Sequence, residues 1–174
     1  MEALHRITCE YVDLEDRIRV AGETEAGERL VLWLTRRLLD RLVPHLAGWL
    51  EKRDTHQAPQ QAMSRLYDEA RQGFAQEAAR AGLKPEPPVP AAAARRSWLV
   101  GAVDINAREE TVALDFRGSG PSENVRLALS EAHLRQWLEI VRELYLRGDW
   151  PLTPWPAWMT PSADPADAPL RLIH

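Results

Sequence analysis

The segment RLVLWLTRRLLDRLVPHLAGWL, residues Arg29–Leu50, contains the change of periodicity that decides the fold. Its first six residues place leucine at every second position, which predicts a strand with one apolar face. Thr35 follows, and a threonine here can cap the free amides at the start of a helix. Beyond it, apolar residues recur at three- and four-residue steps, which predicts an amphipathic helix. We expect Pro44 to kink or end this helix near Val43, because proline lacks an amide hydrogen.

A second segment, Val125–Tyr145, repeats this pattern as VRLALSEAHLRQWLEIVRELY. Ser130 stands where the first segment has Thr35, and a strand-like stretch precedes each segment. We therefore predict two similar strand–strand–helix units, residues 4–50 and 97–147. Both an internal duplication and a chance similarity of two amphipathic segments explain the match.

Turn residues and alternating stretches define the other expected elements. Gly148 ends the last helix, as glycine commonly does. A polar break is expected at Glu51–Pro59. The apolar face of the middle helix runs from Met63 to Ala81 and is mostly alanine after Phe74, so we expect that helix at the surface. The remaining expected elements are strands at Leu4–Tyr11, Arg17–Ala21, Trp98–Ile105 and Thr111–Arg117, a middle helix at residues 60–83, and an extended Pro/Ala linker at residues 84–94.

These elements together predict an α+β domain over residues 1–148. We expect an antiparallel sheet, or two small antiparallel sheets, packed against two or three helices. Residues 149–174 contain many prolines and three tryptophans, which predicts an extended C-terminal strap and excludes a regular helix there.

The order of elements over Arg6–Arg147 is similar to that of the head domains of the eukaryotic end-joining scaffold and centriole-assembly superfamily. In that superfamily a long coiled-coil stalk follows the head, whereas Gly148 and Pro151 end the helix here. A resemblance in element order implies a fold and says little about function.

Composition limits the classes of partner. The chain has 174 residues and a net charge of −4, which argues against bulk attraction to nucleic acid or an anionic membrane. Cys9 is the single cysteine, so no internal disulfide forms. No signal peptide and no run of about 20 apolar residues is present, so we expect no membrane partner and a cytoplasmic protein.

No catalytic motif stands out, and we predict no metal and no cofactor. The histidines lack the paired helical spacing of a metal site. Cys9 fits a buried structural thiol, and the glycines of Gly118–Gly120 lead through a proline into a strand, as in a hairpin turn. Asp104 and Asp115 lie on neighbouring expected strands; they are either a facing pair of acids or ordinary residues of a solvated sheet face.

Arg36 and Arg37 are the candidate anion- or partner-binding residues. They lie in the first turn of the expected helix, where a positive charge interacts unfavourably with the helix dipole unless a nearby anion balances it. That anion is a ligand, an acidic partner, or Asp40 and the acidic hairpin loop Gly22–Glu28 of the chain itself. Solvated arginines without such a partner are the further alternative.

The candidate interface residues are Trp150, Trp155, Trp158 and Met159. Tryptophan anchors many interfaces, and several exposed together would promote aggregation. They are therefore covered by their own domain, by a second copy of the chain or by another protein.

These observations favour a non-catalytic protein–protein interaction or self-association module. Its expected partner is a second copy of the chain or another protein. The alternative is a domain that binds a small molecule or an anion, and whether the chain is an enzyme stays open.

Overall fold

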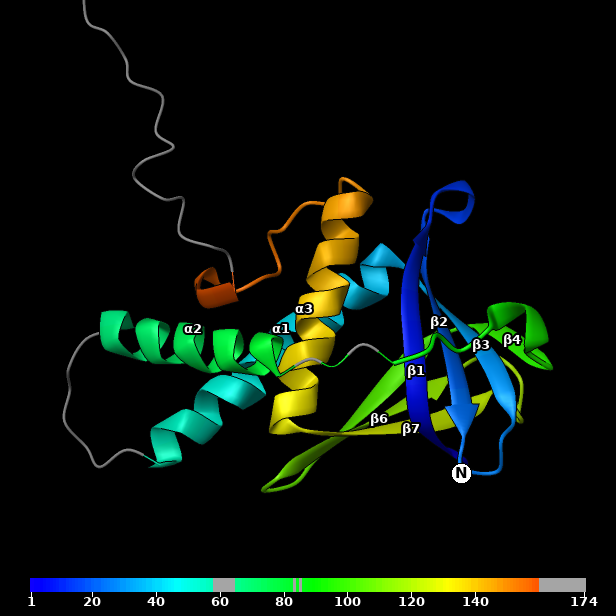
Figure 1. Cartoon of the computed structure of the whole chain (residues 1–174), viewed down its shortest axis with the longest axis horizontal. Helices are drawn as coiled ribbons and strands as arrows, with labels where there is room; N and C mark the ends of the chain where they lie inside the picture. Colours follow the sequence, from blue (N-terminus) through cyan, green and yellow to red (C-terminus); the bar gives the residue numbers. More distant parts are fainter. Residues whose placement is uncertain (58–64, 83, 85, 160–174) are drawn as a thin grey trace, which may run out of the picture.

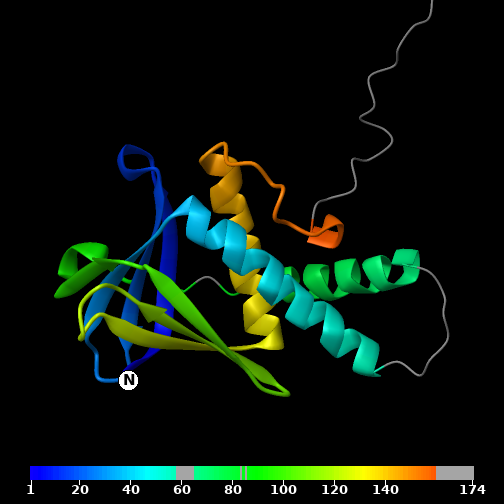
Figure 2. The same ribbon diagram turned by 180° about the vertical axis from the view of Figure 1, so that it is seen from behind.

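The computed structural model describes residues 1–57, 65–82, 84 and 86–159 (Figure 1). Seven strands form one mixed sheet in the order β4-β3-β2-β1-β7-β6-β5, which curls toward the helices α1 and α3 (Figures 1 and 2). The strands are β1 (Ala3–Val12), β2 (Arg17–Thr24), β3 (Arg29–Leu34), β4 (Arg96–Leu99), β5 (Ala102–Ala107), β6 (Thr111–Arg117) and β7 (Asn124–Ser130). The helices are α1 (Arg36–Gln57), α2 (Arg65–Ala81) and α3 (Glu131–Arg147), with short 3₁₀ turns η1 (Asp13–Glu15), η2 (Ala91–Ala93) and η3 (Ala157–Met159).

The prediction of a mixed α and β fold is confirmed, but the prediction of an antiparallel sheet is wrong. Two neighbouring pairs of strands, β1·β7 and β3·β4, are parallel. Both pairs join segments far apart in the sequence, because parallel neighbours need a crossover connection rather than a hairpin. Strand periodicity reports which side chains share a face; it does not report the direction of the neighbouring strand.

The expected single strand Trp98–Ile105 is two strands at opposite edges of the sheet. The Val100 amide donates to the Trp33 carbonyl at 3.0 Å, and the next amide, of Gly101, donates to the Arg117 carbonyl at 2.8 Å. The chain therefore leaves β3 and joins β6 within two residues. This change of partner brings the two edges of the sheet together through one extended segment.

Helix α1 continues through Pro44 and through the start of the expected polar break, ending at Gln57. Of the two expected effects of Pro44, a kink or an end of the helix, the end near Val43 is therefore wrong. Leu39, Val43, Leu46 and Leu50 are fully buried around it. Burying each such side chain is worth about 1.5–3 kcal/mol, and together they outweigh the cost of an internal proline, about 3 kcal/mol.

Helix α3 packs its apolar stripe against the same core. It begins as expected, since Ser130 Oγ accepts a hydrogen bond from the His133 amide at 3.3 Å. Trp137, Leu138, Val141 and Tyr145 are buried against the strands and α1. Among the described helices, none is both long enough and apolar enough to cross a membrane.

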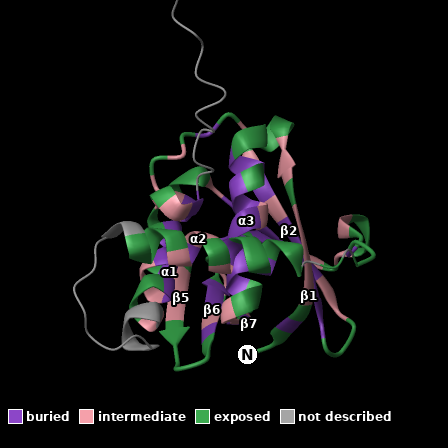
Figure 3. Cartoon of the chain, turned by 60° about the vertical axis from the view of Figure 1, so that its left-hand side comes forward, coloured by how far each residue is buried: buried purple, intermediate pink, exposed green. Residues whose placement is uncertain are grey.

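Helix α2 covers part of the expected middle helix; residues 60–64 and 83 lie outside the described residues. It packs on the domain through its polar side, not through the expected apolar face. Tyr67 and Phe74, on its expected apolar face, are 62% and 72% exposed, whereas Gln72 and Gln76 are buried. In Figure 3 the buried segments gather along α3 and the strands next to it.

The described part of the expected linker lies along the outer face of the sheet. The Val89 side chain is buried against Ala21 and Val31. The Val89 amide donates to Thr8 Oγ1 on β1 at 2.9 Å.

Candidate protein-interaction site

A groove of about 280 Å³ lies between helix α1 and the edge strand β5. One wall is the face of α1 that carries Leu38, Arg41, Leu42 and His45, which follow one another at helical spacing. The other wall is the chain from Gly101 to Ile105. The groove thus has an apolar floor, a cationic rim on the helix and a strand along its opposite side.

Strand β5 is the last strand of the sheet, and its outer edge carries unpaired backbone groups. The Arg108 amide donates to the Thr111 carbonyl at 2.8 Å, which fixes the alternation of hydrogen-bonded pairs in the β5–β6 hairpin. Asp104 and Asn106 therefore exchange backbone hydrogen bonds with β6. The amides and carbonyls of Val103, Ile105 and Ala107 point the other way, where the described part of the chain supplies no further strand.

Arg41 gives the helical wall its positive charge, and the His45 ring lies one turn further along the same side. The Nδ1–H of His45 donates to the Arg41 carbonyl at 2.8 Å, which orients the imidazole. Both side chains are exposed, and Arg37 is exposed one turn before Arg41 on the same side of α1. This wall therefore favours an acidic ligand.

The two arginines expected to bind an anion or a partner are separated by the structure. Arg36 forms an ion pair with Asp40 at 3.9 Å, so an acidic residue of the same helix balances its charge. Arg37 has the groove-side position described above. Neither residue lines the groove itself, and the anion-binding prediction stays a prediction.

Asp104 and Asp115 do lie directly opposite each other on β5 and β6. Each is matched by an arginine: Asp115 accepts two hydrogen bonds from Arg126 at 2.6 and 2.7 Å, and Asp104 pairs with Arg117. The Arg126 hydrogen bonds hold the pKa of Asp115 below its ordinary value. A general acid needs a raised pKa, so this arrangement is that of a salt-bridged sheet face.

The tryptophan-rich segment is covered by its own chain. Trp150, Trp155 and Met159 are buried, with Trp150 and Trp155 edge-on to the Tyr145 ring at 4.9 and 5.4 Å. Trp158 donates from Nε1 to Glu51 on α1 at 2.9 Å. Their role at an interface stays a prediction; the contacts shown here are intramolecular.

The other candidate groups have structural partners. Burial raises the pKa of the Cys9 thiol to about 12, so it is not a thiolate near neutral pH. The amides of Ser119 and Gly120 donate to the Glu123 carboxylate at 2.7 and 2.9 Å, so the glycine loop binds an anion of its own chain. No group of three or more potential metal ligands gathers among the residues that the structure describes.

The sequence did not reveal the groove, because the position of the groove depends on where β4 ends and β5 begins. The available signal was Gly101, a glycine inside an apparently continuous strand, which often marks a bulge or a close approach of backbone. That signal locates a break without showing that the strand changes partner there.

Scans of the chain against protein-family models, curated proteins and solved structures find no match in any of the three. No relative therefore supplies a function, and the geometry of the groove is the available support for one.

Proposed function

We propose that this protein is a non-catalytic interaction module that binds an extended segment of another protein between α1 and β5. The observation that carries the proposal is the free edge of β5 beside a groove. An added strand pairs with the backbone of Val103, Ile105 and Ala107 while alternate side chains enter the groove, which is a common mode of peptide recognition.

The lining of the groove indicates the chemistry of the partner. Side chains of the bound segment that face α1 contact Leu38 and Leu42, so we expect these side chains to be apolar. Side chains of the bound segment that lie near the rim on α1 contact Arg41 and lie close to Arg37, so we expect these side chains to be acidic. At Gly101 and Ala102 the strand has almost no side chain, which lets the partner backbone approach closely.

A small-molecule site has less support from the same groove. Pockets for small ligands usually measure about 300–1,000 Å³ and enclose most of the ligand. At about 280 Å³ the groove lies near the lower end of this range, and its polar groups lie along a strand edge instead of converging on one point.

The proposal is tested by selecting a displayed random peptide library on the full-length chain and titrating the consensus peptide by calorimetry. We expect the consensus to carry apolar and acidic residues at every second position, on the side that faces α1. On binding, the amides of Val103, Ile105 and Ala107 gain protection from hydrogen exchange, while those of Asp104 and Asn106 are already protected without peptide. Only strand addition predicts this odd–even pattern.

Two variants and one control complete the test. Ala107→Pro removes one outward amide without breaking a bond to β6, and we expect roughly two- to tenfold weaker binding, the worth of one hydrogen bond. Arg41→Glu weakens binding further, whereas Arg95→Glu makes the same charge change at the other edge of the sheet and leaves affinity unchanged. A library that yields no consensus, or a peptide indifferent to both groove variants, rejects the proposal.

A further inference from the structure

Helix α2 exposes an apolar stripe to solvent from Tyr67 to Ala81. Tyr67 and Phe74 are 62% and 72% exposed, and the three alanines that continue the same side of the helix are exposed as well. The five positions recur at three- and four-residue steps and therefore lie on one face. They are Tyr67, Ala70, Phe74, Ala78 and Ala81.

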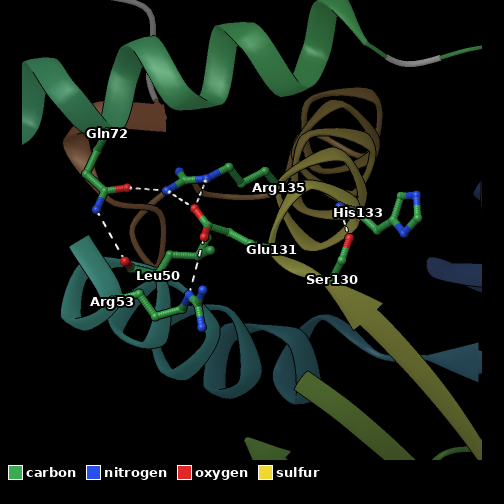
Figure 4. A network of polar contacts seen from close by, with 7 residues as sticks. All are labelled: Leu50, Arg53, Gln72, Ser130, Glu131, His133 and Arg135. Carbon is green, nitrogen blue, oxygen red and sulfur yellow. Dashed lines mark hydrogen bonds and ion pairs between the residues drawn. The ribbon is translucent and has the colours of Figure 1, made fainter. Parts of the chain in front are cut away.

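The opposite face of α2 is polar and buried, which fixes the orientation of the helix. Gln72 accepts a hydrogen bond from Arg135 at 2.9 Å and donates to the Leu50 carbonyl at 3.4 Å (Figure 4). Gln76 donates to the Arg135 carbonyl at 3.0 Å and to Glu139 at 3.2 Å.

The same network connects all three helices. Arg135, only 2% exposed, also binds Glu131 at 3.2 Å, and Glu131 accepts from Arg53 of α1 at 3.3 Å (Figure 4). Turning α2 to bury its aromatic residues would strip hydrogen-bond partners from buried charged groups, a cost of about 1–3 kcal/mol or more for each group. The apolar stripe of α2 therefore faces solvent.

We infer that this stripe, the α2 stripe, is the contact surface for α2 of a second copy of the chain, packed antiparallel about a two-fold axis at Phe74. In that arrangement residues equally far from Phe74 in opposite directions meet. Tyr67 of each copy then faces Ala81 of the other, Ala70 faces Ala78, and the two Phe74 rings meet at the centre. Every large side chain except the central pair lies against a small one, so the surface is complementary to itself.

The size of the surface sets the expected strength. Each copy offers two aromatic side chains that are about two-thirds exposed, from residues that bury roughly 150–250 Å² when covered. With the alanines, the dimer buries on the order of 800 Å² in total, below the 1,200–2,000 Å² of a standard stable interface. We therefore expect a weak, reversible dimer with a Kd on the order of 10–100 μM.

Sedimentation equilibrium of the full chain from about 5 μM to 1 mM tests the inference, with circular dichroism to confirm folding. Phe74→Ala makes the chain monomeric over this range. Leu14→Ala removes an equally apolar side chain, 99% exposed on η1, and leaves the Kd unchanged.

A swap of residue sizes tests the direction of packing. Ala81→Tyr alone sets tyrosine against tyrosine at both ends and weakens the dimer at least tenfold. The double variant Tyr67→Ala/Ala81→Tyr exchanges large and small residues and restores the Kd to within about threefold of the natural chain. A double variant no tighter than the single one rejects antiparallel packing, and a chain that stays monomeric at 1 mM rejects the inference as a whole.

The groove variant separates this dimer from the function proposed above. Ala107→Pro leaves an α2 dimer intact. A dimer that Ala107→Pro abolishes and Phe74→Ala preserves would be paired through β5, and would overturn the assignment to α2.

Discussion

Trp150→Ala tests how much of the stability depends on the segment that follows α3. The Trp150 ring is 5% exposed and packs edge-on against Tyr145 at 4.9 Å and Tyr11 at 5.5 Å. Its Nε1–H donates to Asp16 Oδ1 at 2.7 Å. One side chain therefore joins α3, the β1–β2 connection and the C-terminal segment.

The expected loss follows from the cavity that the alanine leaves. Replacing a buried tryptophan or phenylalanine by alanine costs about 3–5 kcal/mol. For a chain of this length, 1 kcal/mol lowers the melting temperature by about 2–4 °C. The variant should therefore melt roughly 6–20 °C below the natural chain.

Thermal unfolding followed by far-UV circular dichroism measures the difference without depending on tryptophan emission. Trp150→Phe keeps much of the ring packing and loses the donor to Asp16, so its melting temperature should lie between those of the natural chain and Trp150→Ala. Leu14→Ala serves as the exposed control and should melt with the natural chain. A Trp150→Ala protein that melts within about 2 °C of the natural chain would show that the segment is not part of the cooperative fold.

Three further substitutions test the stability of the fold: one should raise it, one should lower it, and the effect of the third should depend on pH. Gly48→Ala, inside α1 with open space around the added carbon, should stabilise the fold by about 0.5–1 kcal/mol in a urea titration. Gly148→Ala places a carbon 2.7 Å from the Tyr11 ring and should destabilise the fold by about 1–3 kcal/mol in the same titration. An unchanged stability would mean that the ring moves aside freely. Arg126 holds the pKa of Asp115 below its unfolded value, so the carboxylate stabilises the fold above about pH 4 and loses this effect as the pH falls through the lowered folded value. The melting temperature of Asp115→Asn should therefore lie furthest below that of the natural chain near neutral pH and approach it in acid, and a gap that does not change with pH would contradict this linkage.

The candidate site shows where local patterns stop being informative. Leu38 and Leu42 were expected on an apolar helix face, and Val103 and Ile105 on a strand. Nothing in the sequence placed those two elements side by side, because the groove depends on the change of strand partner at Gly101. Helix α2 shows the same limit: periodicity identified its apolar stripe, but the buried partners of Gln72 decide which face packs.

The sequence by itself determined most of the elements and the packed faces of β3, α1 and α3. Alternating leucines predicted β3, the three- and four-residue steps predicted α1 and α3, and Ser130 marked the start of α3, because these signals depend on backbone geometry within a few residues. Only the tertiary structure decided that β1·β7 and β3·β4 are parallel, that α1 continues through Pro44, and that α2 packs by its polar face. Each of those outcomes depends on free energy from contacts between residues distant in the chain, which outweighs the local preference and leaves no periodic trace in the sequence.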